Sequence, residues 1–191
     1  IFLSELAERS LLEAVTGVRG ETRGADAMRV FSRWPDGQAS EMSFENGRVP
    51  FLPVIPRTYL SIYSQMPMVK SGGKMGYTYL KPTAITDVAT TPEDPYYIYD
   101  IEDGEAMRGK APQDAEKLIK KRGRLGLTEV EIISLGIHTN VLSRHYVDAV
   151  GSRDDSVGVP YLYLFNGESR LHWRSLGGSR DLWGAASCGS R

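Results

Sequence analysis

Cysteine is nearly absent from this sequence. The 191 residues include one cysteine, Cys188, so no disulfide can form within the chain. A reducing compartment fits this cysteine usage, and we expect a cytoplasmic protein. The three histidines, His138, His145 and His172, together with one thiol offer few ligands for zinc. We therefore expect no metal site and no bound cofactor.

Long apolar runs and an excess of one charge are also missing. The longest apolar run, residues 49–56, contains three prolines and is too short to span a bilayer, so we expect no membrane partner. The formal net charge is -1, and the absence of a global field argues against a nucleic-acid partner. Hydrophobic residues at 41% and charged residues at 25% are typical of a globular domain.

The clearest structural motif is an aromatic-rich stretch around Asn166-Gly167. Asn-Gly supplies the two positive-φ residues of a type I′ turn, which predicts a β-hairpin. The first arm, residues 161–165, is almost continuously apolar, which favours a central strand covered on both faces. In the second arm Leu171 and Trp173 alternate with polar residues, which predicts one buried face.

The other patterns predict an α+β fold with a mainly antiparallel sheet, a C-terminal hairpin and packed helices. Apolar residues at helical spacing predict a helical N-terminal arm over residues 1–48, followed by an α+β domain over residues 49–191. Thr128 and Glu131 form a capping box that opens a helix, which Gly136 is expected to interrupt. Further predictions are a helix at 111–121, strands at 77–80, 95–101 and 146–150, and an extended edge segment at 49–56.

Several short motifs follow one another between Val49 and Arg191. They are Gly-Gly-Lys-Met-Gly (72–76), residues 97–104, residues 123–128 with Glu131, Gly-Ser-Arg (151–153), Val159-Pro160 and residues 186–191. Their order resembles a bacterial family catalogued only as a domain of unknown function. The resemblance covers residues 49–191, leaves residues 1–48 outside and implies a common fold, without a transferable activity, cofactor or catalytic residue. The family pattern Val-Pro-x-Leu-Trp is replaced here by Val-Pro-Tyr-Leu-Tyr (159–163).

The tripeptide Gly-Ser-Arg occurs three times after residue 150. Glycine lets backbone N–H groups turn inward, serine adds a hydroxyl, and arginine offers a planar fork for phosphate or carboxylate. If the segments converge, Arg153, Arg180 and Arg191 with Ser152 form a binding site for a small anion. The alternative is that these arginines pair with the acidic turn at residues 100–105.

Three classes of function follow from these residues. The favoured hypothesis is a binding or regulatory module for a small anionic ligand. The second is a hydrolase- or transferase-like enzyme that uses Asp100, Asp103 and His172, with the arginines holding an anionic substrate. Cys188 paired with His172 or His145 is a further candidate nucleophile, although an isolated cysteine usually behaves as a small buried hydrophobe. The third is an interaction domain that docks on a partner or on a second copy as a homo-oligomer.

Overall fold

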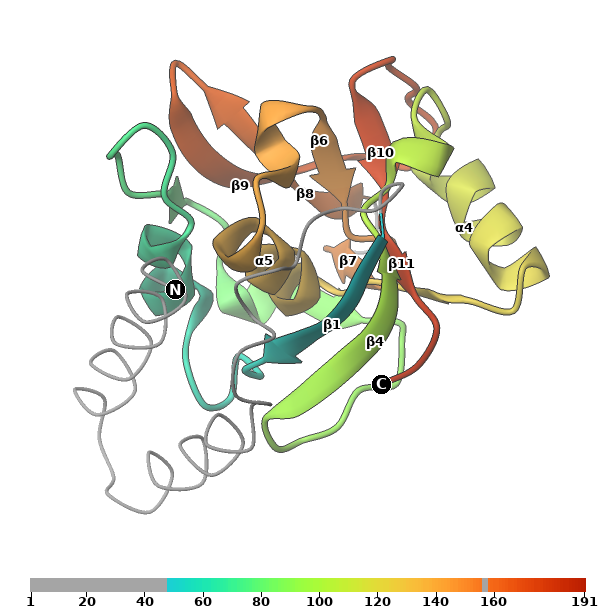
Figure 1. Ribbon diagram of the computed structural model, residues 1–191, viewed down its shortest axis with the longest axis horizontal. Helices are drawn as coiled ribbons and strands as arrows, with labels where there is room; N and C mark the ends of the chain where they lie inside the picture. Colours follow the sequence, from blue (N-terminus) through green and yellow to red (C-terminus); the bar gives the residue numbers. More distant parts are fainter. Residues whose placement is uncertain (1–47, 156–157) are drawn as a thin grey trace.

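Two β-sheets enclose one buried helix in the computed structural model, which describes residues 48–155 and 158–191 (Figure 1). The fold is therefore a mixture of helices and sheets, as predicted. The predicted helical arm lies outside the described residues, except for its last residue, Arg48.

The smaller sheet has the strand order β1-β4-β11-β5. Its strands are antiparallel: β1 (Arg48–Val54), β4 (Tyr96–Glu102), β11 (Ser187–Cys188) and β5 (Leu125–Gly126). The proline-rich run at 49–56 supplies β1, at the edge of this sheet. An edge strand tolerates Pro50 and Pro53 because one side of it makes no ladder hydrogen bonds. The predicted extended edge segment is confirmed.

The larger sheet has the order β10-β6-β8-β7-β3, with β9 on β8 and β2 on β9. These strands are β10 (Trp183–Ala185), β6 (Tyr146–Asp148), β8 (Gly158–Phe165), β7 (Ser152–Asp154), β3 (Ile85–Asp87), β9 (Glu168–Ser175) and β2 (Tyr77–Thr78). Within the described residues, the pairs β10–β6 and β2–β9 are parallel and the others antiparallel.

Helix α5 (Glu129–His138) lies between the two sheets (Figure 1). Its residues Ile132 and Leu135 are fully buried and share one hydrophobic core with Leu52 of β1 and Leu162 of β8. Burial of each such side chain contributes roughly 1.5–3 kcal/mol, so the apolar residues of α5 help to hold the two layers together.

Helix α5 begins with the predicted capping box of Thr128 and Glu131 but is not interrupted by Gly136, so that prediction is wrong. A Cβ on Gly136 would lie 2.6 Å from Leu162 Cδ2 and 3.0 Å from Val69 Cγ1. The glycine is therefore explained by close packing against the larger sheet rather than by a break in the helix.

The β8–β9 hairpin is confirmed, with φ of 50° at Asn166 and 75° at Gly167, as a type I′ turn requires. The prediction that its first arm is covered on both faces is wrong. Leu162 is fully buried, whereas Tyr161 and Tyr163 are half-buried and Phe165 is 48% exposed. Strand β8 thus has a core face and an open aromatic face. Trp173, predicted to be buried, is 42% exposed near the far end of β9.

Helix α4 (Pro112–Lys121) matches the predicted helix at 111–121 and packs beside β10 through Ala115, Ile119 and Ala185. The remaining helical segments are short: α3 (Ile62–Gln65), η2 (Met66–Met68), η3 (Pro82–Ala84), η4 (Glu105–Met107) and η5 (Val141–Ser143). No helix in the described ranges is long and apolar enough to cross a membrane.

Candidate functional site: an aromatic row on the larger sheet

Arg153 and Ser152, the first Gly-Ser-Arg pair, lie on β7 and contact other parts of the protein. The Arg153 guanidinium bonds Glu116 Oε2 of α4 at 2.5 Å and the carbonyls of Val150 and Ser152 at 2.9 Å. Ser152 is fully buried, and its hydroxyl lies 2.6 Å from Asp87 Oδ1 and 2.8 Å from Glu129 Oε2. Both residues therefore serve the packing of β7.

Arg191, the last residue of the third Gly-Ser-Arg, forms a two-pronged ion pair with buried Glu131 of α5. Its Nε and Nη2 lie 2.7 and 2.8 Å from the two carboxylate oxygens, and Nη2 also donates to the Gly126 carbonyl at 2.8 Å. Tyr96 and the Thr128 N–H donate to the same carboxylate, at 2.8 and 2.7 Å. This network supplies the counter-charge that a buried carboxylate requires.

Arg180 is the exposed member of the set, and its guanidinium carbon lies 4.9 Å from the centre of the Trp183 ring. Among the described residues no carboxylate forms an ion pair with it. The three arginines thus have separate partners: Glu116 for Arg153, Trp183 for Arg180 and Glu131 for Arg191. Within the described residues, no two of these three arginines contact the same partner.

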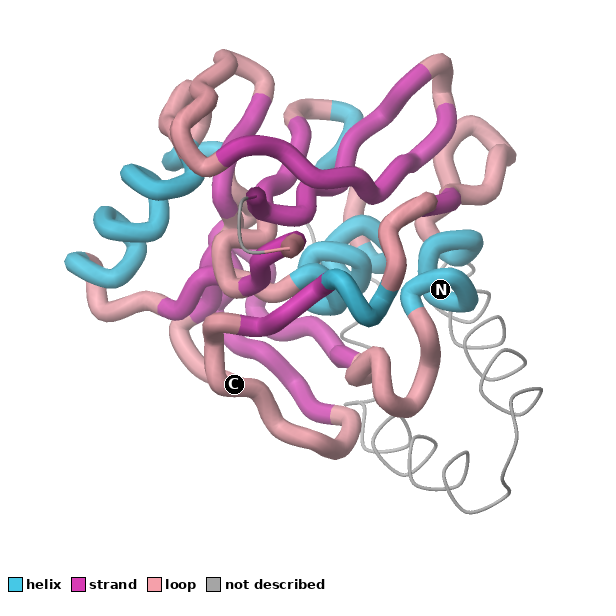
Figure 2. Tube along the Cα trace, turned by 180° about the vertical axis from the view of Figure 1, so that it is seen from behind, coloured by secondary structure: helices cyan, strands magenta, loops and turns pink. Residues whose placement is uncertain are grey.

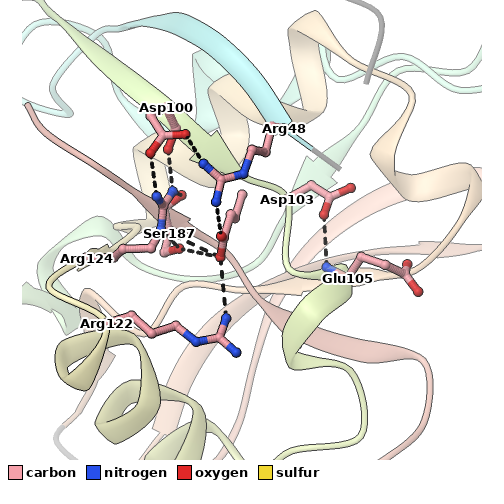
Figure 3. Close-up of polar contacts among 8 residues, drawn as sticks. Arg48, Asp100, Asp103, Glu105, Arg122, Arg124 and Ser187 are labelled. Carbon is pink, nitrogen blue, oxygen red and sulfur yellow. Dashed lines mark hydrogen bonds and ion pairs between the residues drawn. The ribbon is translucent and has the colours of Figure 1, made fainter. Parts of the chain in front are cut away.

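The acidic end of β4 is neutralised by a different group of arginines (Figure 3). Arg48 binds Asp100 at 2.6 Å and Glu102 at 2.9 Å, so the two carboxylates share one face, as strand alternation predicts. Arg124 binds Asp100 at 2.6 Å, and its Nε donates to the Ser187 hydroxyl at 2.9 Å (Figure 3). These contacts, led by the hydrogen bond from Arg124, lower the pKa of Asp100.

The other residues considered for catalysis are dispersed. Asp103 is buried and binds Arg144 at 2.7 Å and the Glu105 N–H at 2.9 Å, away from the ion pairs of Asp100. His172 is exposed on β9. Cys188 is fully buried in the core, and burial raises the pKa of its thiol to about 12. No described group of three or more His, Cys, Asp or Glu side chains is arranged to hold a metal ion.

A buried carboxylate cluster lies where α5 begins. Arg57 bonds Glu129 and lies 2.9 Å from Asp87, while Ser152 bridges the two acids. Burial raises the pKa of Glu129 to about 7, and the negative charge of the neighbouring Asp87 adds to this effect. Every group in this cluster has a partner within it, so the cluster anchors β3, β7 and α5 to one another.

A different arrangement appears on the face of the larger sheet that points away from α5. Trp183 of β10 lies beside Tyr146 of β6, and the register of β6 and β8 places Tyr163 next to Tyr146 with ring centres 5.7 Å apart. Tyr163 is opposite Arg170 of β9, and Arg170 is beside Tyr77 of β2. We call these five residues the aromatic row.

The aromatic row points outward because its neighbours in sequence point inward. Val147, Leu162 and Leu171 are buried in the core that includes α5. Successive strand residues face opposite sides, so the alternate positions lie on the outer face. Figure 1 shows α5 on one side of β8 and β9, and Figure 2 shows these strands from behind.

The rings of the row and its neighbours contact one another. Tyr161, one position before Leu162, stacks on Tyr163 at 4.8 Å and meets Trp183 edge-on at 5.6 Å. The Arg170 guanidinium lies 4.7 Å from the Tyr77 ring centre, a cation–π contact. Burial raises the pKa of Tyr161 to about 12, so its hydroxyl remains a hydrogen-bond donor at neutral pH.

One end of the row rests on a buried ion pair. Arg174 lies 3.1 Å from Asp148 Oδ2, and its guanidinium carbon lies 4.3 Å from the Trp183 ring centre. Burial raises the pKa of Asp148 to about 7 against the opposing effect of Arg174. Arg174 also donates to the Gly178 carbonyl and thereby holds the loop that carries Arg180.

Sequence reasoning missed the aromatic row, although one signal was available. Tyr-x-Tyr occurs at residues 77–79 and again at 161–163, and residues at i and i+2 of a strand share a face. The apolar run at residues 161–165 predicted a strand covered on both faces, and the strand predicted at residues 77–80 had no face assigned. The parallel pairing of β2 with β9, which brings the two segments onto one sheet, has no local signal.

Comparison with known proteins identifies a family but no characterised relative. Residues 14–188 match the sequence model of a family described as a family of unknown function (DUF5701). No curated protein and no solved structure matches the chain. The match begins at residue 14, so the earlier placement of all residues up to 48 outside the resemblance is wrong.

Proposed function

The chain belongs to DUF5701, whose function is unknown, and we propose that it is a binding module whose recognition surface is the aromatic row. The supporting observation is that four aromatic rings and one guanidinium align across five strands on a face that α5 leaves uncovered. An antiparallel sheet with one solvated face normally places polar side chains there. Clustered aromatic side chains on such a face are typical of an interaction site.

The chemistry of the row favours a ligand that combines a planar ring with negative charge. Tyrosine and tryptophan rings offer stacking surfaces, and the tyrosine hydroxyls offer hydrogen bonds. At one end, Arg180 is exposed beside Trp183 and has no carboxylate partner among the described residues. This proposal keeps the anionic ligand expected from the sequence and places it at Arg180 rather than at three converging arginines.

Titration of the protein with adenosine 5′-monophosphate, followed by NMR of the aromatic side chains, tests this function. Adenosine and inorganic phosphate are the partial ligands. We expect the nucleotide to shift the signals of Tyr163 and Trp183 more than either partial ligand does. Tyr163→Ala should weaken nucleotide binding by at least about fivefold, because one stacked ring contributes about 1–3 kcal/mol.

Tyr63 provides the matched control, because it is a 49% exposed tyrosine on α3, outside the larger sheet. Tyr63→Ala should bind the nucleotide as the parent does. If the three probes shift the row equally, or not at all, the proposed recognition surface is wrong.

A further inference from the structure

The aromatic row is longer than one small ligand. Its side chains come from β10, β6, β8, β9 and β2, which are neighbours in that order. Adjacent strands lie about 4.8 Å apart, so the row spans about 19 Å from Trp183 to Tyr77. A single planar ring can cover one or two of these positions. The full row therefore matches a chain of repeating rings better than one mononucleotide.

The two segments that contain β2 and most of β9, at one end of the row, are rich in positive charge. Residues 70–81, which contain β2, carry three lysines and no carboxylate, and residues 169–180, which contain most of β9, carry three arginines and no carboxylate. The parallel pairing of β2 with β9 sets these segments side by side. These two segments therefore carry a local excess of positive charge, although the net charge of the whole chain is -1.

The carboxylates nearest to these segments leave several cations unmatched. Glu168 pairs with Arg170 at 3.1 Å and lies 3.9 Å from Lys74, and Asp148 pairs with Arg174. Asp181 directly follows Arg180 in the sequence but forms no ion pair with it within the described residues. Lys70, Lys81 and Arg180 are exposed and form no ion pair within the described residues. Positive groups are thus present near both ends of the row.

We propose that the aromatic row binds single-stranded nucleic acid, an inference that rests on the function proposed above. Successive bases stack on Tyr77, Tyr163 and Tyr146, which is the sequence-tolerant mode of aromatic sheet surfaces. Phosphates meet Arg180 at one end and the lysines of residues 70–81 at the other. Double-stranded nucleic acid keeps its bases stacked on each other and cannot offer their faces to the row.

Fluorescence anisotropy with labelled oligonucleotides tests the inference. The probes are a 12-nucleotide thymidine strand, a 12-base-pair duplex, and polyglutamate as a competitor that is a polyanion without rings. We expect the single strand to bind at least about tenfold more tightly than the duplex and to resist displacement by polyglutamate. It should also bind more tightly than a single nucleotide, because several rings stack at once.

Variants separate stacking from charge. Tyr163→Ala and, independently, Tyr77→Ala should each weaken binding of the strand at least about fivefold at every salt concentration. Arg180→Gln should instead reduce the slope of log affinity against log salt by about 0.7, the contribution of one phosphate contact on a single strand. Tyr63→Ala and Arg122→Gln, both outside the row, are the matched controls. Circular dichroism melting verifies that each variant is folded.

The outcomes separate this inference from the proposed function. If adenosine monophosphate shifts the row but the strand binds no more tightly than the monomer, the polymer inference is wrong and the small-ligand function stands. If neither ligand shifts the row, both are wrong. Equal binding of strand, duplex and polyglutamate would mean charge attraction alone and would overturn the inference. A dimer that dissociates in Tyr163→Ala without oligonucleotide binding would assign the face to a second copy of the chain.

Discussion

At the residue scale, two positions in the hairpin turn determine how far the aromatic face extends. Asn166 and Gly167 both adopt positive φ, which reverses the chain within two residues and sets Phe165 opposite Glu168. With this register Tyr163 meets Arg170 rather than a core residue. A shift by one residue would turn every side chain of β9 to the other face.

Gly167→Val should therefore be strongly destabilising. No atom lies within 4 Å of a Cβ built on Gly167, so the loss would come from backbone strain at a φ of +75° rather than from a clash. We expect a decrease in the free energy of unfolding of about 1–3 kcal/mol. Urea denaturation measures it, with Gly177→Val as control because Gly177 is exposed and does not require a positive φ. Equal stability of the two variants would contradict the assigned turn.

Cys188 should be chemically inert in the folded protein. Its thiol is fully buried and its pKa is raised to about 12, chiefly by burial, so little thiolate exists at neutral pH. We expect thiol reagents to label it only after denaturation. Rapid labelling of the native protein with a midpoint near pH 7 would restore the nucleophile hypothesis.

At the scale of elements, α5 joins the sheets through apolar side chains but begins with two buried carboxylates. Glu129 is matched by Arg57 from the loop after β1, and Glu131 by Arg191 after β11. Each of these arginines therefore connects a distant loop to the start of one helix. Breaking one buried pair leaves the other charge uncompensated, which is more costly than losing an exposed pair.

Arg191→Met tests this difference. Because its partner Glu131 is fully buried, we expect a loss of about 3–5 kcal/mol in the free energy of unfolding. Arg48→Met is the control, since its side chain is 54% exposed and exposed pairs contribute about 0–1 kcal/mol. Similar losses in both variants would show that burial does not determine the strength of these pairs.

Elements with local signals were predictable, whereas the candidate site was not. The capping box at Thr128 and the Asn-Gly turn are fixed by neighbouring residues, and both were found. Gly136 was misinterpreted because its reason is the packing of Leu162, 26 residues away in sequence. The aromatic row depends on four strand pairings, two of them parallel, and long-range pairings leave no periodic pattern in the sequence.

At the scale of the whole molecule, stability should depend on pH through Glu129 and Asp148. The folded state raises both pKa values to about 7, from ordinary values of 4.5 and 3.8, so between these limits it holds more protons than the unfolded state. The contribution of these groups to the free energy of unfolding therefore decreases as pH rises from about 4 through the folded-state pKa values and is constant above about pH 8.

Urea denaturation between pH 5 and pH 8 measures this slope. Glu129→Gln should flatten it, because a neutral side chain has no proton to lose at that position. Lys117→Gln, in an exposed ion pair on α4, should leave it unchanged. A slope that persists undiminished in Glu129→Gln would assign the dependence to other groups. Carboxylates with a lowered pKa, such as Asp100 and Glu116, act in the opposite direction at lower pH.

The position of β10 and β11 in the sheets constrains when the protein can fold during synthesis. Strand β11 lies between β4 and β5 in the smaller sheet, and β10 forms an edge of the larger one, although both come from residues 183–188. Until these residues have left the ribosome, β4 and β5 cannot be joined and Trp183 cannot complete the row. Both sheets are therefore completed only after translation has passed β11, and nascent chains stopped before residue 183 should be more sensitive to protease than the full chain.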